Sequence, residues 1–76
     1  MQPYSNLNRD SPIIAYAPLG SAIVVRYRGN VDYTYTAADL GQNHIDRMCS
    51  LGAAGSGLST YINQHPDVKN GYSSKS

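Results

Sequence analysis

The amino-acid sequence predicts a small α+β fold, in which a three-stranded antiparallel meander is followed by one main helix and a short second helix (βββαα). Three observations support this prediction. Two β-prone runs flank Gly29-Asn30 within the stretch from Ile23 to Thr36, which is a strong hairpin signal. Another β-prone run precedes them, and apolar residues in the second half recur at helical spacing. With 76 residues, the chain has the length of one domain.

The first strand is expected from Ile13 to Ala17. Pro12 precedes it, and a proline at the start of a strand is typical of an edge position. The segment that follows, from Pro18 to Ser21, has proline and glycine where a turn uses them. Residues 1–11 are polar, and we expect a flexible segment with Tyr4 and Leu7 as its candidate anchors.

Two registers compete for the hairpin, and they differ in which side chains share a face. A two-residue loop would mix apolar and polar groups on both faces. A three-residue loop, Arg28 to Asn30, places Val25 opposite Tyr33 and Arg26 opposite Asp32. It gathers the apolar side chains on one face: Ile23, Val25, Tyr27, Val31, Tyr33 and Tyr35. Because burial of an apolar face selects the register, we expect this loop, with its last residue in the left-handed conformation.

The main helix is expected to begin near Gln42. A hydroxyl-to-acid start signal lies earlier, at Thr36 to Asp39, but Gly41 weakens a helix that begins there. One side of the helix is apolar and should pack on the tyrosine and valine face of the sheet; it consists of Ile45, Met48, Cys49, and Leu51 or Gly52. The glycine-rich residues 52–57 close this helix.

A short second helix is expected from the spacing of Leu58, Tyr61 and Ile62, with Ser56 as its candidate cap. It should end before Pro66, because the residue that precedes a proline avoids helical geometry. Residues 66–76 are expected to be a flexible tail, so the single domain spans residues 12–65.

Composition restricts the classes of function and location. The net charge is +1 with six lysines and arginines, which is too weak to attract a long polyanion. Specific binding of a small anion remains compatible with this charge. A single cysteine, Cys49, excludes an internal disulfide and fits a reducing compartment. Neither a signal-peptide pattern nor an apolar run of about 20 residues is present, so we expect a cytoplasmic protein without membrane contact.

The spacing of nucleophiles, bases and metal ligands argues against an enzyme. His44 and Cys49 lie five residues apart, about 140° around a helix, and cannot form a local nucleophile–base pair. His65 lies beyond the second helix, and its distance along the sequence does not place it near His44 or Cys49. No carboxylate pair of the glycosidase kind and no metal-ligand spacing is evident, so no catalytic residue, metal or cofactor is expected.

Three groups of residues are candidate ligand sites. The first is the hairpin face and tip, where Arg26 and Arg28 can hold phosphate and tyrosines can stack on bases; the candidate tyrosines are Tyr16, Tyr33 and Tyr35. The alternative is that Tyr33 and Tyr35 belong to the core and that Arg26 forms an ordinary ion pair with Asp32. The other two groups are Gly55-Ser56-Gly57 and Asn43, His44 and Arg47.

The glycine loop offers backbone N–H groups to an anion at a helix start, although a simple joint between helices explains it as well. In the group on the main helix, Arg47 lies one turn after Asn43, so these two residues share a face. His44 can donate to a phosphate or titrate near neutral pH. A solvated helix face is the alternative explanation for that group.

The chain also resembles the KTSC domain over about Tyr16 to Ile62. The resemblance lies in Ile-Val-Val-Arg-Tyr followed by a tight turn and Tyr-Thr-Tyr, and further along in His44-Ile45, Met48, Leu51, Gly55-Ser56-Gly57-Leu58 and Tyr61-Ile62. The family is named for the C-terminal segment of some lysyl-tRNA synthetases, and it also occurs as short bacterial and phage proteins. It implies a small sheet with a packed helix, and no established activity or catalytic set. The chain departs from the family pattern in its Gly-Asn turn and at Asp32.

Two functions from different classes remain open. The first is a non-enzymatic module that binds a nucleotide or a short nucleic-acid phosphate; the resemblance to short phage proteins suggests a form that sequesters a nucleotide signal, as in counter-defence. The second is a protein–protein interaction module that uses the edge strand or a tyrosine patch, which would also allow a homo-oligomer. A purely structural role within a larger assembly is a third alternative.

Overall fold

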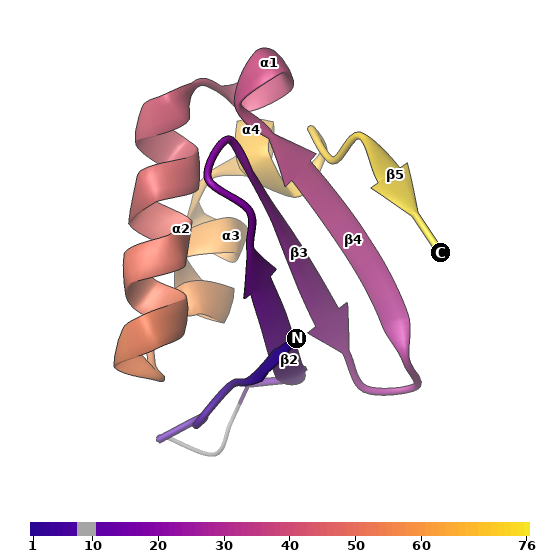
Figure 1. The fold of residues 1–76 in the computed structure, drawn as a ribbon, viewed down its shortest axis with the longest axis vertical. Helices are drawn as coiled ribbons and strands as arrows, with labels where there is room; N and C mark the ends of the chain where they lie inside the picture. Colours follow the sequence, from indigo (N-terminus) through magenta and orange to yellow (C-terminus); the bar gives the residue numbers. More distant parts are fainter. Residues whose placement is uncertain (8–10) are drawn as a thin grey trace.

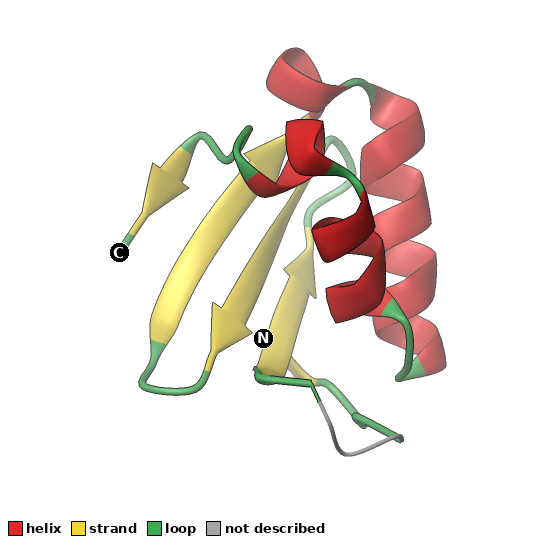
Figure 2. Cartoon of the chain, turned by 180° about the vertical axis from the view of Figure 1, so that it is seen from behind, coloured by secondary structure: helices red, strands yellow, loops and turns green. Residues whose placement is uncertain are grey.

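A computed structural model describes residues 1–7 and 11–76 of the chain. Five antiparallel strands form one sheet in the order β1-β2-β3-β4-β5, and the helices lie on one of its faces (Figures 1 and 2). The elements in chain order are β1 (Gln2–Pro3), β2 (Ile13–Pro18), β3 (Ala22–Tyr27), β4 (Val31–Thr36), α1 (Ala37–Leu40), α2 (Gln42–Ala54), α3 (Leu58–Gln64), α4 (Pro66–Lys69) and β5 (Ser74–Lys75).

The predicted α+β class and antiparallel pairing are confirmed, but the sheet is wider than a three-stranded meander. β1 pairs with β2 at Ala15 and Tyr16, and β5 pairs with β4 at Tyr33 and Thr34. Both additions come from terminal segments that have too few apolar residues to predict a strand. They satisfy backbone groups that the outer edges of β2 and β4 would otherwise expose. The prediction that the strand from Ile13 to Ala17 lies at the edge of the sheet is therefore wrong, because β1 lies outside it.

The hairpin between β3 and β4 has the predicted register. Val25 lies opposite Tyr33, and Arg26 lies opposite Asp32. Gly29 and Asn30 have φ angles of 87° and 61°, so the loop uses the left-handed region as a three-residue connection requires. This register brings the apolar side chains of the hairpin onto the face that the helices cover.

A β-bulge between Ile13 and Ala15 changes the direction of the side chains along β2, so that Ile13 and Tyr16 both face the core. Ile13 and Tyr16 are three residues apart, and a regular strand would point them to opposite faces. The bulge inserts one extra residue, so both side chains are buried, with exposed fractions of 1% and 4%. Alternation alone does not predict this bulge.

The core lies between the tyrosine and valine face of the sheet and the helices. Its fully buried members come from the sheet and from α2, α3 and α4: Ile13, Ile23, Val25, Tyr35, Ile45, Met48, Leu58 and Val68. α2 approaches β2 closely at Gly52, where an added Cβ would lie 2.9 Å from Cδ2 of Tyr16. The predicted apolar side of the main helix is confirmed at Ile45, Met48 and Gly52, while Cys49 and Leu51 are half-buried.

The two predicted helices are present, with differences at their ends. α2 begins at Gln42 as expected, and the start signal at Thr36 produces only the single turn α1. Gly55, with φ of 79°, closes α2 and donates its N–H to carbonyl oxygens of the last turn. The expectation that Ser56 caps α3 is wrong, because Gly57, which has no side chain to form a cap, occupies the N-cap position with φ of 88°. The Leu58 N–H instead donates to the Tyr4 hydroxyl at 3.3 Å.

Both terminal segments contribute side chains to the core. Tyr4 is buried against Tyr16, with their rings 6.5 Å apart edge to face, whereas Leu7 is exposed. Pro66 ends α3 as expected but also begins α4, where the missing N–H of a proline is tolerated at the first position. Val68 of α4 is fully buried. The division into a domain of residues 12–65 with flexible ends stays a prediction.

In the described part of the chain, no helix combines the length and apolar character that crossing a membrane requires.

Candidate functional site

A cleft of about 450 Å³, partly open to solvent, lies along β4. Its lining comes from the β3–β4 hairpin, from the end of α3, and from the C-terminal segment between Lys69 of α4 and Lys75 of β5, which we call the C-terminal wall. Its volume falls within the range of small-molecule sites, about 300–1,000 Å³. The residues that give it chemical character are tyrosines and cations: Tyr27, Tyr33, Tyr35, Tyr72, Arg28, Lys69 and Lys75.

Tyr33 is the centre of the aromatic part of the cleft. The rings of Tyr27 and Tyr72 meet it edge to face, with centroids 5.2 and 4.9 Å away, and Tyr35 lies parallel to it at 6.5 Å. Alternation along β4 places Tyr33 and Tyr35 on one face, and the hairpin register adds Tyr27 diagonally. Tyr35 is 1% exposed, whereas Tyr33 and Tyr27 are half-buried and Tyr72 is 40% exposed. The tyrosines therefore divide between core and cleft surface.

Three cationic side chains line the cleft: Arg28 from the hairpin loop, Lys69 from α4 and Lys75 from β5. The Lys75 ammonium lies 5.4 Å from the centre of the Tyr33 ring, which is a cation–π distance. No acidic residue lines the cleft, and among the described residues no ion pair involves these cations. The cleft therefore has a positive potential that favours an anion.

The hydroxyls of Tyr27 and Tyr35 offer hydrogen-bond donors but no negative charge at neutral pH. Burial raises the pKa of Tyr35 well above its usual value, and the neighbouring Tyr27 hydroxyl raises it further. Burial also raises the pKa of Tyr27. Both groups stay protonated near pH 7, so they are neutral donors beside the cations.

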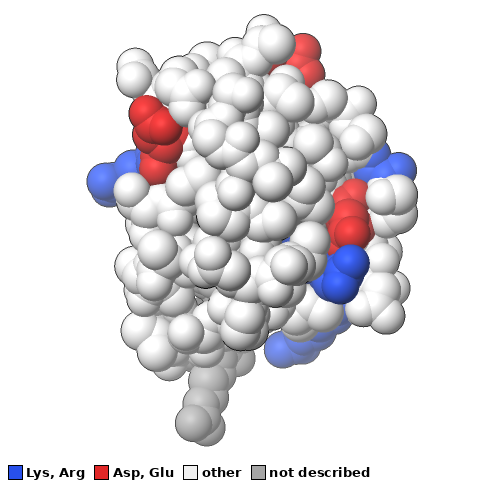
Figure 3. Space-filling view, viewed as in Figure 1, with Lys and Arg blue, Asp and Glu red and all other residues white. Residues whose placement is uncertain are grey.

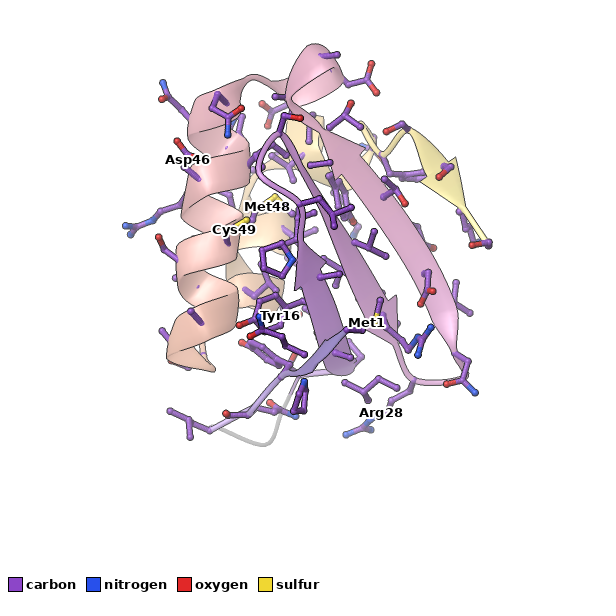
Figure 4. All side chains as sticks on the ribbon, in the orientation of Figure 1. Met1, Tyr16, Arg28, Asp46, Met48 and Cys49 are labelled. Carbon is purple, nitrogen blue, oxygen red and sulfur yellow. The ribbon has the colours of Figure 1, made fainter. Side chains whose placement is uncertain are left out.

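Arg26 and Tyr16, two of the predicted site residues, lie away from this cleft. Arg26 is on the opposite face of the sheet, where its Nε lies 2.8 Å from Oδ1 of Asp32 and its second contact to Oδ2 is 3.0 Å. This pairing lowers the pKa of the Asp32 carboxyl. Tyr16 is buried beneath α2, and its hydroxyl donates to the Gln2 side chain at 3.1 Å (Figure 4). Of the predicted hairpin group, the cleft contains Arg28, Tyr33 and Tyr35.

The predicted glycine loop at residues 55–57 lies at a second, smaller cavity. This cavity is about 180 Å³, and the described residues that line it are polar and include no charged side chain. The N–H of Gly55 is used to close α2, and a Cβ at Gly55 would lie 2.7 Å from the Cβ of Ser5. Close packing and the φ angles of Gly55 and Gly57 account for these glycines as a joint between α2 and α3.

The predicted group on the main helix is split by the fold. Asn43 and Arg47 are exposed on α2, but His44 is half-buried between the helices. Its Nδ1 lies 2.6 Å from the Tyr61 hydroxyl, and its Nε2 lies 3.2 Å from Oδ2 of Asp67. A neutral imidazole meets both contacts when Tyr61 donates to Nδ1 and the Nε2–H donates to Asp67. His44 thus joins α2 to α3 and α4.

His65, at the end of α3, joins the same cluster. Its ring lies 4.1 Å from that of Tyr61 and 5.6 Å from that of His44, and its Nδ1 donates to the Tyr61 carbonyl at 2.7 Å. Residues 21 positions apart meet here only because α3 and α4 fold back on α2, which spacing in the sequence does not reveal. Within residues 1–7 and 11–76, no three side chains of His, Cys, Asp or Glu gather as metal ligands.

Sequence reasoning missed the C-terminal side of the cleft. Lys69, Tyr72 and Lys75 fall in the segment that was expected to be a tail. The signal available in the sequence is an aromatic residue between two lysines in an otherwise small and polar segment. Gly71 confirms that this segment is closely packed, because a Cβ there would lie 2.5 Å from Cδ2 of Leu40 and would also clash with the Asp67 carbonyl oxygen.

Comparison of this chain with protein-family models, curated proteins and solved structures finds no match.

Proposed function

We propose that this protein is a small non-enzymatic binding module whose cleft takes a nucleotide or a short nucleic-acid phosphate. The observation that carries the proposal is the composition of the cleft around Tyr33. A half-buried ring has a lysine ammonium 5.4 Å from its centre, and among the described lining residues it is accompanied by two further cations and by no acid.

The charge of the cleft supports an anionic ligand over a cationic one. Clusters of tyrosines also bind quaternary ammonium groups, since a cation is attracted to the ring face. Here Arg28, Lys69 and Lys75 would repel such a ligand, and the lining residues that the structure describes include no carboxylate to offset them. Phosphate suits this set, because arginine binds it through two parallel hydrogen bonds and lysine as a point charge.

The exposed tyrosine area supports a planar group on the same ligand. Stacking of a base on an aromatic side chain contributes about 1–3 kcal/mol, and it tolerates different bases. Tyr33 and Tyr72 are the accessible rings, while Tyr35 forms the buried base of the wall. A nucleotide combines a planar ring with phosphate in one molecule of a size that such a cleft accommodates.

The overall charge supports a small ligand over a long polymer. Figure 3 shows few and scattered charged side chains on one face of the molecule, with no extended basic region there. A net charge of +1 gives little counterion-release affinity for a polyanion. Binding of one nucleotide signal, and its sequestration in the form suggested by the KTSC resemblance, is consistent with this balance.

Calorimetric titration with nucleoside mono-, di- and triphosphates and cyclic nucleotides tests the proposal. Arg28→Gln should weaken the tightest complex about tenfold, which is about 1.4 kcal/mol. Arg47→Gln is the matched control, because Arg47 is an exposed arginine on α2 outside the cleft, and it should leave affinity unchanged. Absence of binding by every nucleotide at 1 mM, about −4 kcal/mol, would refute the proposal.

The competing protein-interaction function receives less support. β1 covers the outer edge of β2 at Ala15 and Tyr16, so this edge is not available along its whole length. Ile14 and Leu19 are exposed nearby, but two separate apolar side chains are ordinary on a protein surface.

A further inference from the structure

The cations of the cleft lie at different positions along β4. Arg28 belongs to the hairpin loop that leads into Val31, and Figure 4 shows it at the hairpin end of the sheet. The Arg28 N–H donates to the Pro12 carbonyl oxygen at 2.9 Å, which holds this part of the loop against the segment before β2. Lys75 pairs with Tyr33 in the middle of β4.

Lys69 approaches from the opposite end. It is the last residue of α4, and Gly71, two residues later, packs directly on Leu40 of α1. Because α1 follows immediately after β4, this contact places the end of α4 near Thr36 (Figure 1). The part of β4 that lines the cleft, from Val31 to Tyr35, spans about 13 Å at about 3.3 Å per residue. One cation therefore serves each end of the cleft, with Tyr33 and Lys75 between them.

This distribution distinguishes between ligands that have the same number of phosphates in different places. A nucleoside stacked at Tyr33 has positive side chains toward both ends of the cleft. A ligand with all its phosphates on the 5′ side fills one end and leaves the other cation without a partner. A ligand with phosphate on both sides of the sugar reaches both, because the long side chains of Arg28 and Lys69 are exposed and adaptable.

We propose that the cleft is specific for a nucleotide unit that carries phosphate on both the 3′ and the 5′ side of its ribose. This inference rests on the proposed nucleotide-binding function and narrows it. The unit occurs as a free nucleoside 3′,5′-bisphosphate or as an internal residue of a short single strand, and both present the same chemistry to the cleft.

The test compares nucleoside 3′,5′-bisphosphates with the corresponding 5′-diphosphates by calorimetry, for adenosine, guanosine, cytidine and uridine. Each pair shares base, sugar and number of phosphates, but the bisphosphate carries more negative charge, because each of its two monoesters ionises twice. The 5′-triphosphate of the preferred base has the same number of ionisable oxygens as the bisphosphate, so it serves as the charge-matched reference and should also bind more weakly than the bisphosphate. The bisphosphate of the preferred base should bind at least tenfold more tightly. Equal affinities, or tighter binding of the 5′-diphosphate, overturn the inference and leave the proposed function standing. Absence of binding by all eight ligands at 1 mM overturns both.

Two variants test the assignment of the two ends. Arg28→Gln and Lys69→Gln should each lower affinity for the bisphosphate several-fold, whereas the 5′-diphosphate should respond to only one of them. Equal responses of both ligands to both variants contradict the assignment. Arg47→Gln again serves as control, and circular dichroism establishes that each variant is folded. A trinucleotide in the same titration separates the free nucleotide from the single strand as the source of this unit. Binding at least as tight as that of the bisphosphate assigns the ligand to a strand. Weaker binding assigns it to the free nucleotide.

Discussion

Val68 offers a direct test of whether the C-terminal wall of the cleft is a packed part of the fold. The residue lies in α4, its side chain is fully buried, and it is next in the chain to the cleft residue Lys69. Val68→Ala removes two methyl groups from the core. At about 0.8 kcal/mol for each buried carbon, the transfer term alone is about 1.6 kcal/mol.

Two further effects modify this value in opposite directions. The cavity left behind adds to the cost, because the surroundings relax only in part. The better helix propensity of alanine offsets up to about 0.7 kcal/mol. We therefore expect a loss of about 2 kcal/mol in the free energy of unfolding, which corresponds to roughly 8–16 °C in Tm for a domain of this size.

Urea unfolding followed by circular dichroism measures this loss, with a lower midpoint at an unchanged slope as the signature. Val24→Ala is the control, because Val24 is half-buried on the face of the sheet opposite the helices, and its replacement should cost about 1 kcal/mol or less. A loss below about 0.5 kcal/mol for Val68→Ala, or one smaller than that of the control, would show that α4 does not pack as described. The cleft would then lack one wall.

Two further predictions concern the site and the pH dependence of stability. Tyr33→Leu should weaken binding of the preferred nucleotide by about 1–3 kcal/mol, since it removes the stacking surface; Tyr16→Phe should leave affinity unchanged in the same titration, and an equal loss in both variants would argue against the cleft. Because Arg26 lowers the pKa of Asp32, their pairing stabilises the fold above the ordinary aspartate pKa of about 3.9, and this contribution is lost as pH falls through the folded-state value. Urea midpoints between pH 2 and pH 7 should therefore fall less steeply on the acid side for Arg26→Gln than for the wild type, and parallel curves would contradict the assignment.

The hairpin illustrates what binary patterning can predict. Only the three-residue loop collects the apolar side chains of β3 and β4 on one face, and the strands pair in that register. The same register predicted the contact between Arg26 and Asp32, whose guanidinium and carboxylate form two hydrogen bonds. Gly41 likewise predicted a start of α2 near Gln42, and Pro66 predicted the end of α3 before it. In these segments, local periodicity and burial agree.

The candidate site was predictable only in part. Arg28, Tyr33 and Tyr35 were expected together, and all of them line the cleft. Arg26 was grouped with them as part of the exposed hairpin face, and the register places it on that face, opposite the one that carries Tyr33 and the cleft. Tyr16 was grouped with them as an aromatic residue of the neighbouring strand, and the approach of α2 at Gly52 buries it.

The sequence by itself determined the elements whose side chains repeat with a period, because burying one apolar face leaves a single register for the hairpin and a single inward side for α2. Only the tertiary structure decided which tyrosines are core and which line the cleft, since Tyr33 and Tyr35 have the same local pattern and differ in what covers them. The meeting of Lys75 with Tyr33 was also decided there, because it joins residues 42 positions apart through a backbone pairing that no side-chain pattern encodes.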